Sequence, residues 1–305
     1  MKIIDAHMHS DPGPANPEAI LQRMDSIGVD GGGVFSPEAE NPIRGGGHSY
    51  EVRMKTLEDW TKGYEDRLFP ILYINPLEPE AIAKARDAAS RGVVAFKIIC
   101  DSFYVYEDPC MELMHECAKL DKPVMFHSGI LWDGYDSSKY NQPLNWESLI
   151  MVPGLRFSLA HCAWPWTDDA IAMYGKFLNG YAETNFASNP NVSAEMYLDL
   201  TPGTPAVYRK DLIYKLLNAG YDTPHNIIFG TDCTINDYNT TWADSWIKRD
   251  SALMDETGAC NRIKELYFGE NFKRFLGLIP KDFQHVMPVP DRADAWSLEY
   301  ANATL

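Results

Sequence analysis

The chain has 305 residues and a formal net charge of −16. A surface this acidic repels nucleic-acid phosphates and anionic membranes, which excludes both as expected partners. The apolar content of 45% is ordinary for a globular protein. No apolar run is long enough to cross a bilayer, and no signal peptide opens the chain. We therefore expect a globular cytoplasmic protein.

Short apolar segments that predict β-strands recur along the chain. They lie at residues 2–6, 32–35, 68–74, 93–99, 123–127, 155–161, 196–200 and 227–230. Helices are predicted between them at residues 20–27, 51–62, 79–90, 110–120, 146–151, 170–178 and 205–218, and the chain after residue 232 is predicted to be helical to about residue 276. Apolar strands that alternate with helices are typical of a parallel sheet covered by helices.

Eight strand–helix units in a chain of this length predict an α/β fold, the (β/α)₈ TIM barrel. The length also fits two modest domains, but no linker divides the chain. We therefore expect a single domain over residues 1–305, with the barrel at about 2–278, a helical extension at its C-terminal end and a tail at 279–305. A doubly wound open sheet is the alternative, but no G-x-G-x-x-G follows a strand to support it.

The first predicted strand leads directly into His7 and His9. Residues two apart on a strand point to the same side, so these two imidazoles can share one metal ion. Asp5 has the same parity and could accept a hydrogen bond from a ring N–H behind them.

Other strands also end in side chains that suit a metal site. In a TIM barrel the active site lies at the C-terminal ends of the strands. The polar residues at those ends are His7, His9, Lys97, His127, His161 and Asp232. Half of the eight histidines stand at these positions, and all six residues except the lysine are ready metal ligands. The pattern predicts a metal centre at the mouth of the barrel.

Four short motifs give the chain a resemblance to a known family. They are D-A-H-M-H at 5–9, F-H-S-G at 126–129, L-A-H-C at 159–162 and F-G-T-D-C at 229–233. Together they resemble the amidohydrolase superfamily, and within it the amidohydrolase-related group that includes non-oxidative decarboxylases of aromatic and amino-muconate acids. The run at 263–278 is similar to the terminal helix of that group, so the resemblance covers residues 2–278.

The resemblance implies a role for each strand-end residue. His7, His9 and His127 would bind a divalent metal, most often zinc, and Asp232 would complete the shell and take a proton from the bound water. His161 would either ligate the metal or act as the acid/base beside it. Such a shell leaves a position for water, whose pKa a metal lowers from about 15.7 towards about 7.

Lys97 leaves three alternatives open. By resemblance it could be carboxylated and bridge two metals, so a second metal is expected only in that case. It could instead hold a substrate carboxylate, or be paired structurally inside the barrel, since a buried ammonium near a metal is costly.

The loops above the same mouth carry candidate substrate-binding residues. Trp132 and Tyr135 after the fifth strand, and Trp164 after the sixth, could stack on a flat or ring substrate, although subunit or lid packing is the alternative. Arg44 or Arg53 could bind a substrate carboxylate bidentately, with surface solvation as the alternative. Thr201, at the end of the seventh strand, could add a hydrogen bond.

These expectations combine into one leading hypothesis: a metal-dependent hydrolase in which activated water attacks the carbonyl of an amide, lactone or ester of a small, ring-containing acid. His161 and Asp232 would move the protons. The alternative is a metal-dependent non-oxidative decarboxylase, a lyase, acting on an aromatic or unsaturated acid. A ligand-binding protein on an inactive barrel predicts a missing ligand, and none is missing. The expected partners are a small-molecule substrate and, from the resemblance, a second copy of the chain.

Overall fold

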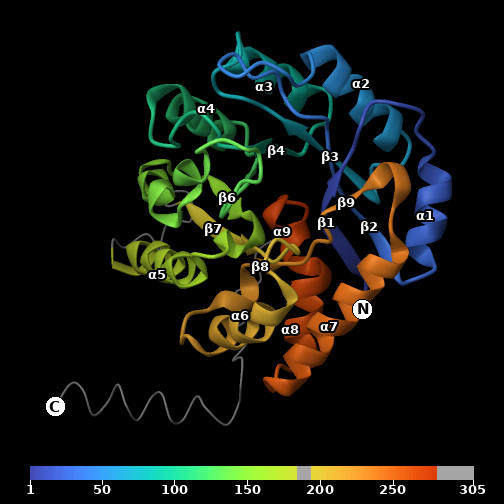
Figure 1. Cartoon of the computed structure of the whole chain (residues 1–305), viewed down its shortest axis with the longest axis vertical. Helices are drawn as coiled ribbons and strands as arrows, with labels where there is room; N and C mark the ends of the chain where they lie inside the picture. The colour runs from blue at the N-terminus through green and yellow to red at the C-terminus, as the bar shows by residue number, and fades with distance from the viewer. Residues whose placement is uncertain (184–193, 280–305) are drawn as a thin grey trace.

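A parallel sheet that curls into a barrel forms the centre of the molecule, and helices lie outside it (Figure 1). This computed structural model describes residues 1–183 and 194–279. The strands are β1 (Ile3–His9), β2 (Val29–Phe35), β3 (Leu68–Tyr73), β4 (Ala95–Ile98), β5 (Val124–Phe126), β6 (Arg156–Leu159), β7 (Glu195–Asp199), β8 (Ile227–Ile228) and β9 (Cys233–Thr234).

The barrel closes where the last strands meet the first. Neighbouring strands pair in the order β8-β7-β6-β5-β4-β3-β2-β1-β9, so β8 and β9 stand at the two ends of the sheet. The segment between them joins these ends, because Ala6 N donates to Phe229 O at 2.9 Å and Asp232 N donates to His7 O at 3.0 Å. The chain from β8 to β9 therefore occupies the eighth strand position. This confirms the predicted (β/α)₈ barrel, and the open sheet was the wrong alternative.

The helices cover the outside of this barrel (Figure 1). They are α1 (Pro17–Asp25), α2 (Tyr50–Thr61), α3 (Ala81–Ser90), α4 (Asp108–Lys119), α5 (Thr167–Glu183), α6 (Ala206–Asn218), α7 (Thr240–Glu256), α8 (Asn261–Glu265) and α9 (Asn271–Phe275). The segment predicted to be helical at 146–151 is part of a 3₁₀ helix, Pro143–Met151. Within the described ranges, no helix combines the length and the apolar character needed to cross a membrane.

Helix α9 seals one end of the barrel. Its Phe272 and Phe275 join the buried cluster that fills the interior with side chains such as Ile4 and Ile71. Arg156, the first residue of β6, donates to the backbone oxygen of Phe275 at 2.7 Å. Since α9 thus lies at the N-terminal ends of the strands, the C-terminal ends remain available for a site. The tail predicted after residue 279 lies outside the described residues.

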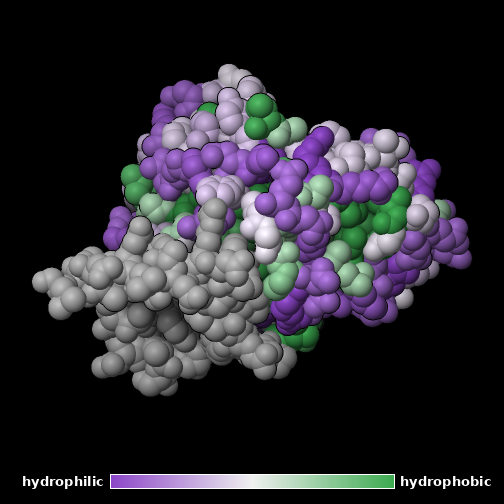
Figure 2. Space-filling model, turned by 90° about the horizontal axis from the view of Figure 1, so that it is seen from below, coloured by the Kyte–Doolittle hydropathy of each residue, from purple (hydrophilic) through white to green (hydrophobic). Residues whose placement is uncertain are grey.

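Figure 2 shows one face of the molecular surface. On the face shown in Figure 2, hydrophilic residues separate small groups of hydrophobic ones. Small scattered apolar groups are normal for a protein surface.

Candidate metal centre and active site

The C-terminal mouth of the barrel brings the predicted strand-end residues together. His7 and His9 lie on β1 and Lys97 on β4, while His127 follows β5, His161 follows β6 and Asp232 precedes β9. The ring centroids of His7 and His161 are 5.6 Å apart, and those of His127 and His161 are 5.1 Å apart.

His7, His9 and Asp232 form the tightest group of potential ligands. Asp232 Oδ1 lies 3.3 Å from His7 Nε2 and 3.1 Å from His9 Nε2. In the described part of the chain, these are the three side chains that each offer a ligand atom within 4.8 Å of the others. Two imidazoles and one carboxylate are a ligand set that zinc accepts, with room for further ligands. The donor chemistry therefore fits a divalent ion.

The backbone conformation around Asp232 places its carboxylate beside His7 and His9. Asp232 has a φ of +59°, a left-handed conformation that a non-glycine residue adopts at a cost of about 1 kcal/mol or more. Gly230 allows the close approach, because a Cβ at that position would lie 2.6 Å from the Cβ of His7. The G-T-D sequence thus fits the seam between β8 and β1.

Asp5 corrects one prediction, because it does not accept a hydrogen bond from a histidine ring. Its carboxylate accepts from Thr231 Oγ1 at 2.5 Å, from Thr231 N at 2.9 Å and from the Tyr238 hydroxyl at 3.0 Å. Burial raises the pKa of Asp5 to about 6. Asp5 therefore ties β1 to the segment that carries Asp232.

Asp199, which the sequence reasoning missed, is the partner of the His7 ring. His7 Nδ1 donates to Asp199 Oδ2 at 2.6 Å, and both side chains are buried. This bond fixes the tautomer and leaves the lone pair of Nε2 free for a metal. Burial, with the charge of Lys97 as the next cause, holds the pKa of His7 well below its usual range, so the ring is neutral. An aspartate closing the apolar segment M-Y-L-D was the signal that could have revealed it.

His161 has the opposite tautomer. Its Nδ1 accepts the Gly203 N–H at 3.2 Å and lies 2.9 Å from the Thr201 hydroxyl. Since a backbone N–H can only donate, Nδ1 is the acceptor and Nε2 carries the hydrogen of the neutral ring. Burial lowers the pKa of His161 to about 4, which outweighs the opposing effect of Asp232. This arrangement favours a donor beside the metal over a metal ligand.

A buried ion pair anchors the end of β7 that sets both tautomers. Arg209 donates to the carbonyl oxygen of Leu200, the residue between Asp199 and Thr201. Arg209 Nη2 lies 2.6 Å from Asp250 Oδ2, and both side chains are fully buried. Asp199 and Thr201 are therefore held in place from behind.

His127 lies beside the tightest group and outside it. Its Nε2 lies 3.2 Å from the carbonyl oxygen of Ile130, to which it can only donate. The neutral ring then has its lone pair on Nδ1. Burial, followed by the charge of His161, holds the pKa of His127 well below its usual range.

Lys97 presents a buried amine without a partner. Its Nζ makes no hydrogen bond to any residue that the structure describes, and it lies 4.9 Å from the centroid of the Phe35 ring. Burial lowers the pKa of Lys97 to about 8, although the carboxylates of Asp199 and Asp232 oppose the shift. Buried polar groups are normally paired, so this amine indicates a place for an external anion.

Two of the three predicted aromatic residues lie at the surface. Trp132 is 83% exposed and Tyr135 is 63% exposed. Trp164 is partly buried, and its ring centroid lies 5.8 Å from that of Tyr208. The Trp132 side chain is therefore largely open to solvent.

The two predicted arginines are both engaged within the protein. Arg53 is fully buried, with Nη2 2.5 Å and Nη1 3.1 Å from the two carboxylate oxygens of Glu78. A substrate could reach Arg53 only by breaking this buried pair, so its predicted substrate-binding role was wrong. Arg44 is partly buried and lies 2.6 Å from Asp133, which neutralises its charge. Arg44 therefore connects the loop after β2 with the loop after β5.

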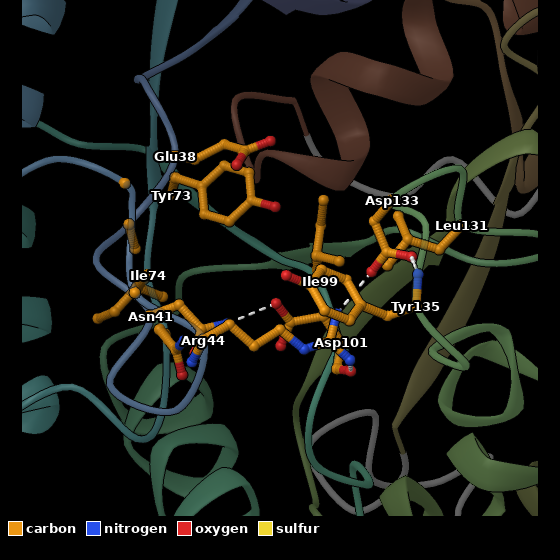
Figure 3. Close-up of a pocket in the computed structure, with 14 residues that line it drawn as sticks. Glu38, Asn41, Arg44, Tyr73, Ile74, Ile99, Asp101, Leu131, Asp133 and Tyr135 are labelled. Carbon is orange, nitrogen blue, oxygen red and sulfur yellow. Dashed lines mark hydrogen bonds and ion pairs between the residues drawn. The ribbon is translucent and has the colours of Figure 1, made fainter.

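Two concave features adjoin the mouth. A cavity of about 200 Å³ lies among the loops that follow β2, β3, β4 and β5 (Figure 3). An open groove of about 510 Å³ runs along residues 232–242 and begins at Asp232. The candidate metal ligands therefore lie where a small molecule can reach them.

Comparisons with known proteins agree with the barrel fold. The model of a family described as amidohydrolase matches residues 4–278. An uncharacterized TIM-barrel protein from Bordetella bronchiseptica is 17% identical with a TM-score of 0.64, covering 91% of this chain and 99% of its own. The 2,6-dihydroxybenzoate decarboxylase from Rhizobium is 14% identical with a TM-score of 0.59, covering 91% and 99%. The dihydroorotase from Campylobacter jejuni is 12% identical with a TM-score of 0.55, covering 92% and 85%. No curated protein matches the chain.

Proposed function

The chain belongs to the amidohydrolase family, and on this basis we propose that it is a metal-dependent hydrolase. The bond cleaved is an amide, lactone or ester, and the substrate is a small carboxylic acid. The observation that carries this proposal is the opposite tautomers of two neighbouring histidines, His7 and His161.

The proposed ion is zinc, held by His7, His9 and Asp232. His127, which lies beside this group, is proposed as a further ligand. A divalent ion at this position would lower the pKa of a water molecule and polarise a carbonyl oxygen. His7 is prepared to ligate, because Asp199 holds the hydrogen on Nδ1 and leaves Nε2 bare.

Asp232 and His161 are in the protonation states that hydrolysis requires. Burial acts to raise the pKa of Asp232, but the hydrogen bond from His9 and the other nearby histidines hold it well below its usual range. Asp232 is therefore a carboxylate at neutral pH and can take a proton from the attacking water. His161 offers Nε2–H as a donor to the carbonyl oxygen, on which negative charge develops.

Lys97 supports the choice of an acid as substrate. A protonated amine that is buried at the mouth and lacks a partner gains most from an anionic group of the ligand. The alternative, a carboxylated Lys97 between two metals, would remove this positive charge.

The same lysine is the observation that favours the second candidate, a decarboxylase. Decarboxylation needs a proton delivered to carbon, and Lys97 has a pKa of about 8, so it still carries a proton at neutral pH. The decarboxylase from Rhizobium and the dihydroorotase from Campylobacter jejuni share the fold, so likeness of fold does not choose between the reactions.

One experiment separates the two candidates. Zinc-loaded protein is incubated with carboxylate-bearing amides and lactones and with hydroxybenzoic acids, while acid release is followed in a pH-stat and CO₂ is trapped. Acid release without CO₂ supports the hydrolase, and the Asp232→Asn variant should abolish it. CO₂ release from the benzoic acids without hydrolysis of any amide or lactone would establish the decarboxylase instead.

A further inference from the structure

The cavity among the loops after β2 to β5 contains polar groups that the protein leaves unsatisfied. Tyr73 is 6% exposed and lines this cavity, and its hydroxyl makes no hydrogen bond to a residue in the described ranges. The Glu38 carboxylate lies on the same wall in Figure 3; its residue is exposed to solvent and pairs with no side chain in the described ranges. The hydroxyl of a buried tyrosine that opens into a cavity beside a carboxylate indicates a polar place where a ligand can bind.

A single arginine, Arg44, lies on the side of the cavity opposite Glu38 and Tyr73. Arg44 lies 2.6 Å from Asp133, donates to the carbonyl oxygen of Asp101, and stands 4.4 Å from the centroid of the Tyr135 ring. One guanidinium thus joins the loops after β2, β4 and β5, as Figure 3 shows for Arg44 and Asp101. Because Asp133 neutralises Arg44, its charge is not available to the cavity.

The remaining charge of the cavity is negative. Three carboxylates line it (Glu38, Asp101 and Asp133) against the one guanidinium of Arg44, which leaves a formal charge of −2. Asp101 already accepts from Asn41 and Ser102, so Glu38 is the carboxylate left for a ligand. Burial, and next the charges of Glu38 and Asp101, raise the pKa of Tyr73 well above its usual range. The field at this wall therefore favours a cation.

The cavity adjoins the proposed catalytic centre. Tyr73 is the register partner of Lys97 in the sheet, so their side chains leave neighbouring strands on the same face. Lys97 in turn stands over Phe35, whose ring centroid is 4.5 Å from that of His7. A substrate lying over Lys97 can therefore reach the cavity.

We propose that this cavity binds the part of the substrate remote from the cleaved bond, and that this part carries an ammonium group that pairs with Glu38 and Tyr73. The inference deepens the proposed hydrolase function and names its substrate class: a compound with a carboxylate for Lys97 and an ammonium for Glu38. A tail of three carbons and one ammonium fits a cavity of about 200 Å³.

Three matched probes test the cavity by binding, separately from catalysis. They are Nα-acetyl-L-ornithine, Nα-acetyl-L-norleucine and Nα-acetyl-L-2-aminoadipate, whose similar tails end in an ammonium, a methyl and a carboxylate. Calorimetry on the zinc-loaded protein should show that the ornithine compound binds about tenfold or more tightly than the norleucine compound, and that the aminoadipate compound binds most weakly.

Two variants test whether the preference for the ammonium tail depends on Glu38. Glu38→Gln should remove the advantage of the ammonium tail and leave the affinity for the methyl tail unchanged. The control is Glu40→Gln, which removes an exposed glutamate outside the cavity lining and should keep the advantage. Equal affinities in the wild type, a preference that survives Glu38→Gln, or no binding of any probe would each overturn the proposal.

Hydrolysis is measured separately, as acetate release from the same compounds. A preference for the ammonium tail that depends on Glu38, without acetate release, supports the cavity and counts against an amide hydrolase. Acetate release with equal affinities supports the hydrolase and refutes the cavity assignment. The two proposals can therefore fail independently.

Discussion

Asp199 and His7 are joined by a 2.6 Å hydrogen bond between the last residue of β7 and the first candidate ligand on β1. Partners of this kind set the orientation and basicity of a ligating histidine, and their loss typically weakens metal binding about 10- to 100-fold. We expect Asp199→Asn to weaken zinc binding by this factor, measured by competition with a chelator. The control is Asp211→Asn, an exposed residue paired with Lys215. Unchanged zinc affinity in Asp199→Asn would contradict the role of this bond.

His161 can be tested by separating metal binding from turnover. If it donates from Nε2–H, His161→Gln should lower kcat about 100- to 1000-fold, the usual effect of losing one donor to a developing oxyanion. Zinc content, measured by elemental mass spectrometry, should remain as in the wild type. A loss of zinc in this variant would show that His161 is a ligand.

Lys97 predicts a pH dependence of substrate binding. Its pKa of about 8 means that the ammonium is lost as the pH rises through 8, so kcat/KM for an anionic substrate should fall above that value. The profile is measured from pH 6 to 10. A fall of kcat/KM that is equally steep for an uncharged ester would argue against an ion pair with the substrate.

The same pKa predicts that Lys97 lowers stability. The folded pKa of about 8 is below the ordinary value of 10.5, so between these values the unfolded chain holds more protons and stability rises with pH. Below pH 8 the full cost is present, about 3 kcal/mol. Lys97→Met should therefore raise the free energy of unfolding at pH 7, measured in urea, while abolishing activity. A variant less stable than the wild type at pH 7 would refute this account.

Arg53 should matter for stability and leave catalysis unchanged. Breaking its buried pair leaves Glu78 with Lys84 as a partner at 2.8 Å, so we expect Arg53→Met to cost about 3 kcal/mol in unfolding free energy. The double variant Arg53→Met/Glu78→Leu should recover much of this loss. In both, KM should match the wild type at a temperature where the protein is folded. A raised KM would restore the substrate-binding role.

Metal content per chain distinguishes a Lys97 with a free amine from a carboxylated Lys97 that bridges two metals. With one mononuclear centre of His7, His9, His127 and Asp232, protein purified without chelator should contain about one zinc per chain. Chelation should lower both activity and the melting temperature, and added zinc should restore them. About two zinc ions per chain would indicate a carboxylated Lys97 instead.

The barrel could be predicted from the sequence because its strands are apolar throughout and alternate with helices. The eighth strand was harder, since its pairing is divided between two-residue strands on either side of a turn at Asp232. His7, His9 and Asp232 were found because ligand types stood at strand ends. Asp199 was missed because the predicted seventh strand ran one residue further, to Leu200, so Asp199 did not stand at its end.

Other assignments depend on partners that a sequence does not place. Arg53 lies in α2 and finds Glu78 after β3, a pairing that no local pattern reveals. The two histidine tautomers depend on atoms from β7 and the loop after it, far along the chain from His7 and His161. Residue type could therefore predict which side chains meet at the mouth, while the direction of each hydrogen bond required the fold.

The candidate metal centre lies at the seam of the barrel and needs both the first and the last strand. Two of the three clustered ligands, His7 and His9, come from the first strand, while Asp232 comes from the last. A nascent chain that ends before Asp232 carries the histidines without their carboxylate, so it cannot assemble the cluster. An ion bound across the seam would link the first and the last strand of the barrel, so ion binding would stabilise the closed ring.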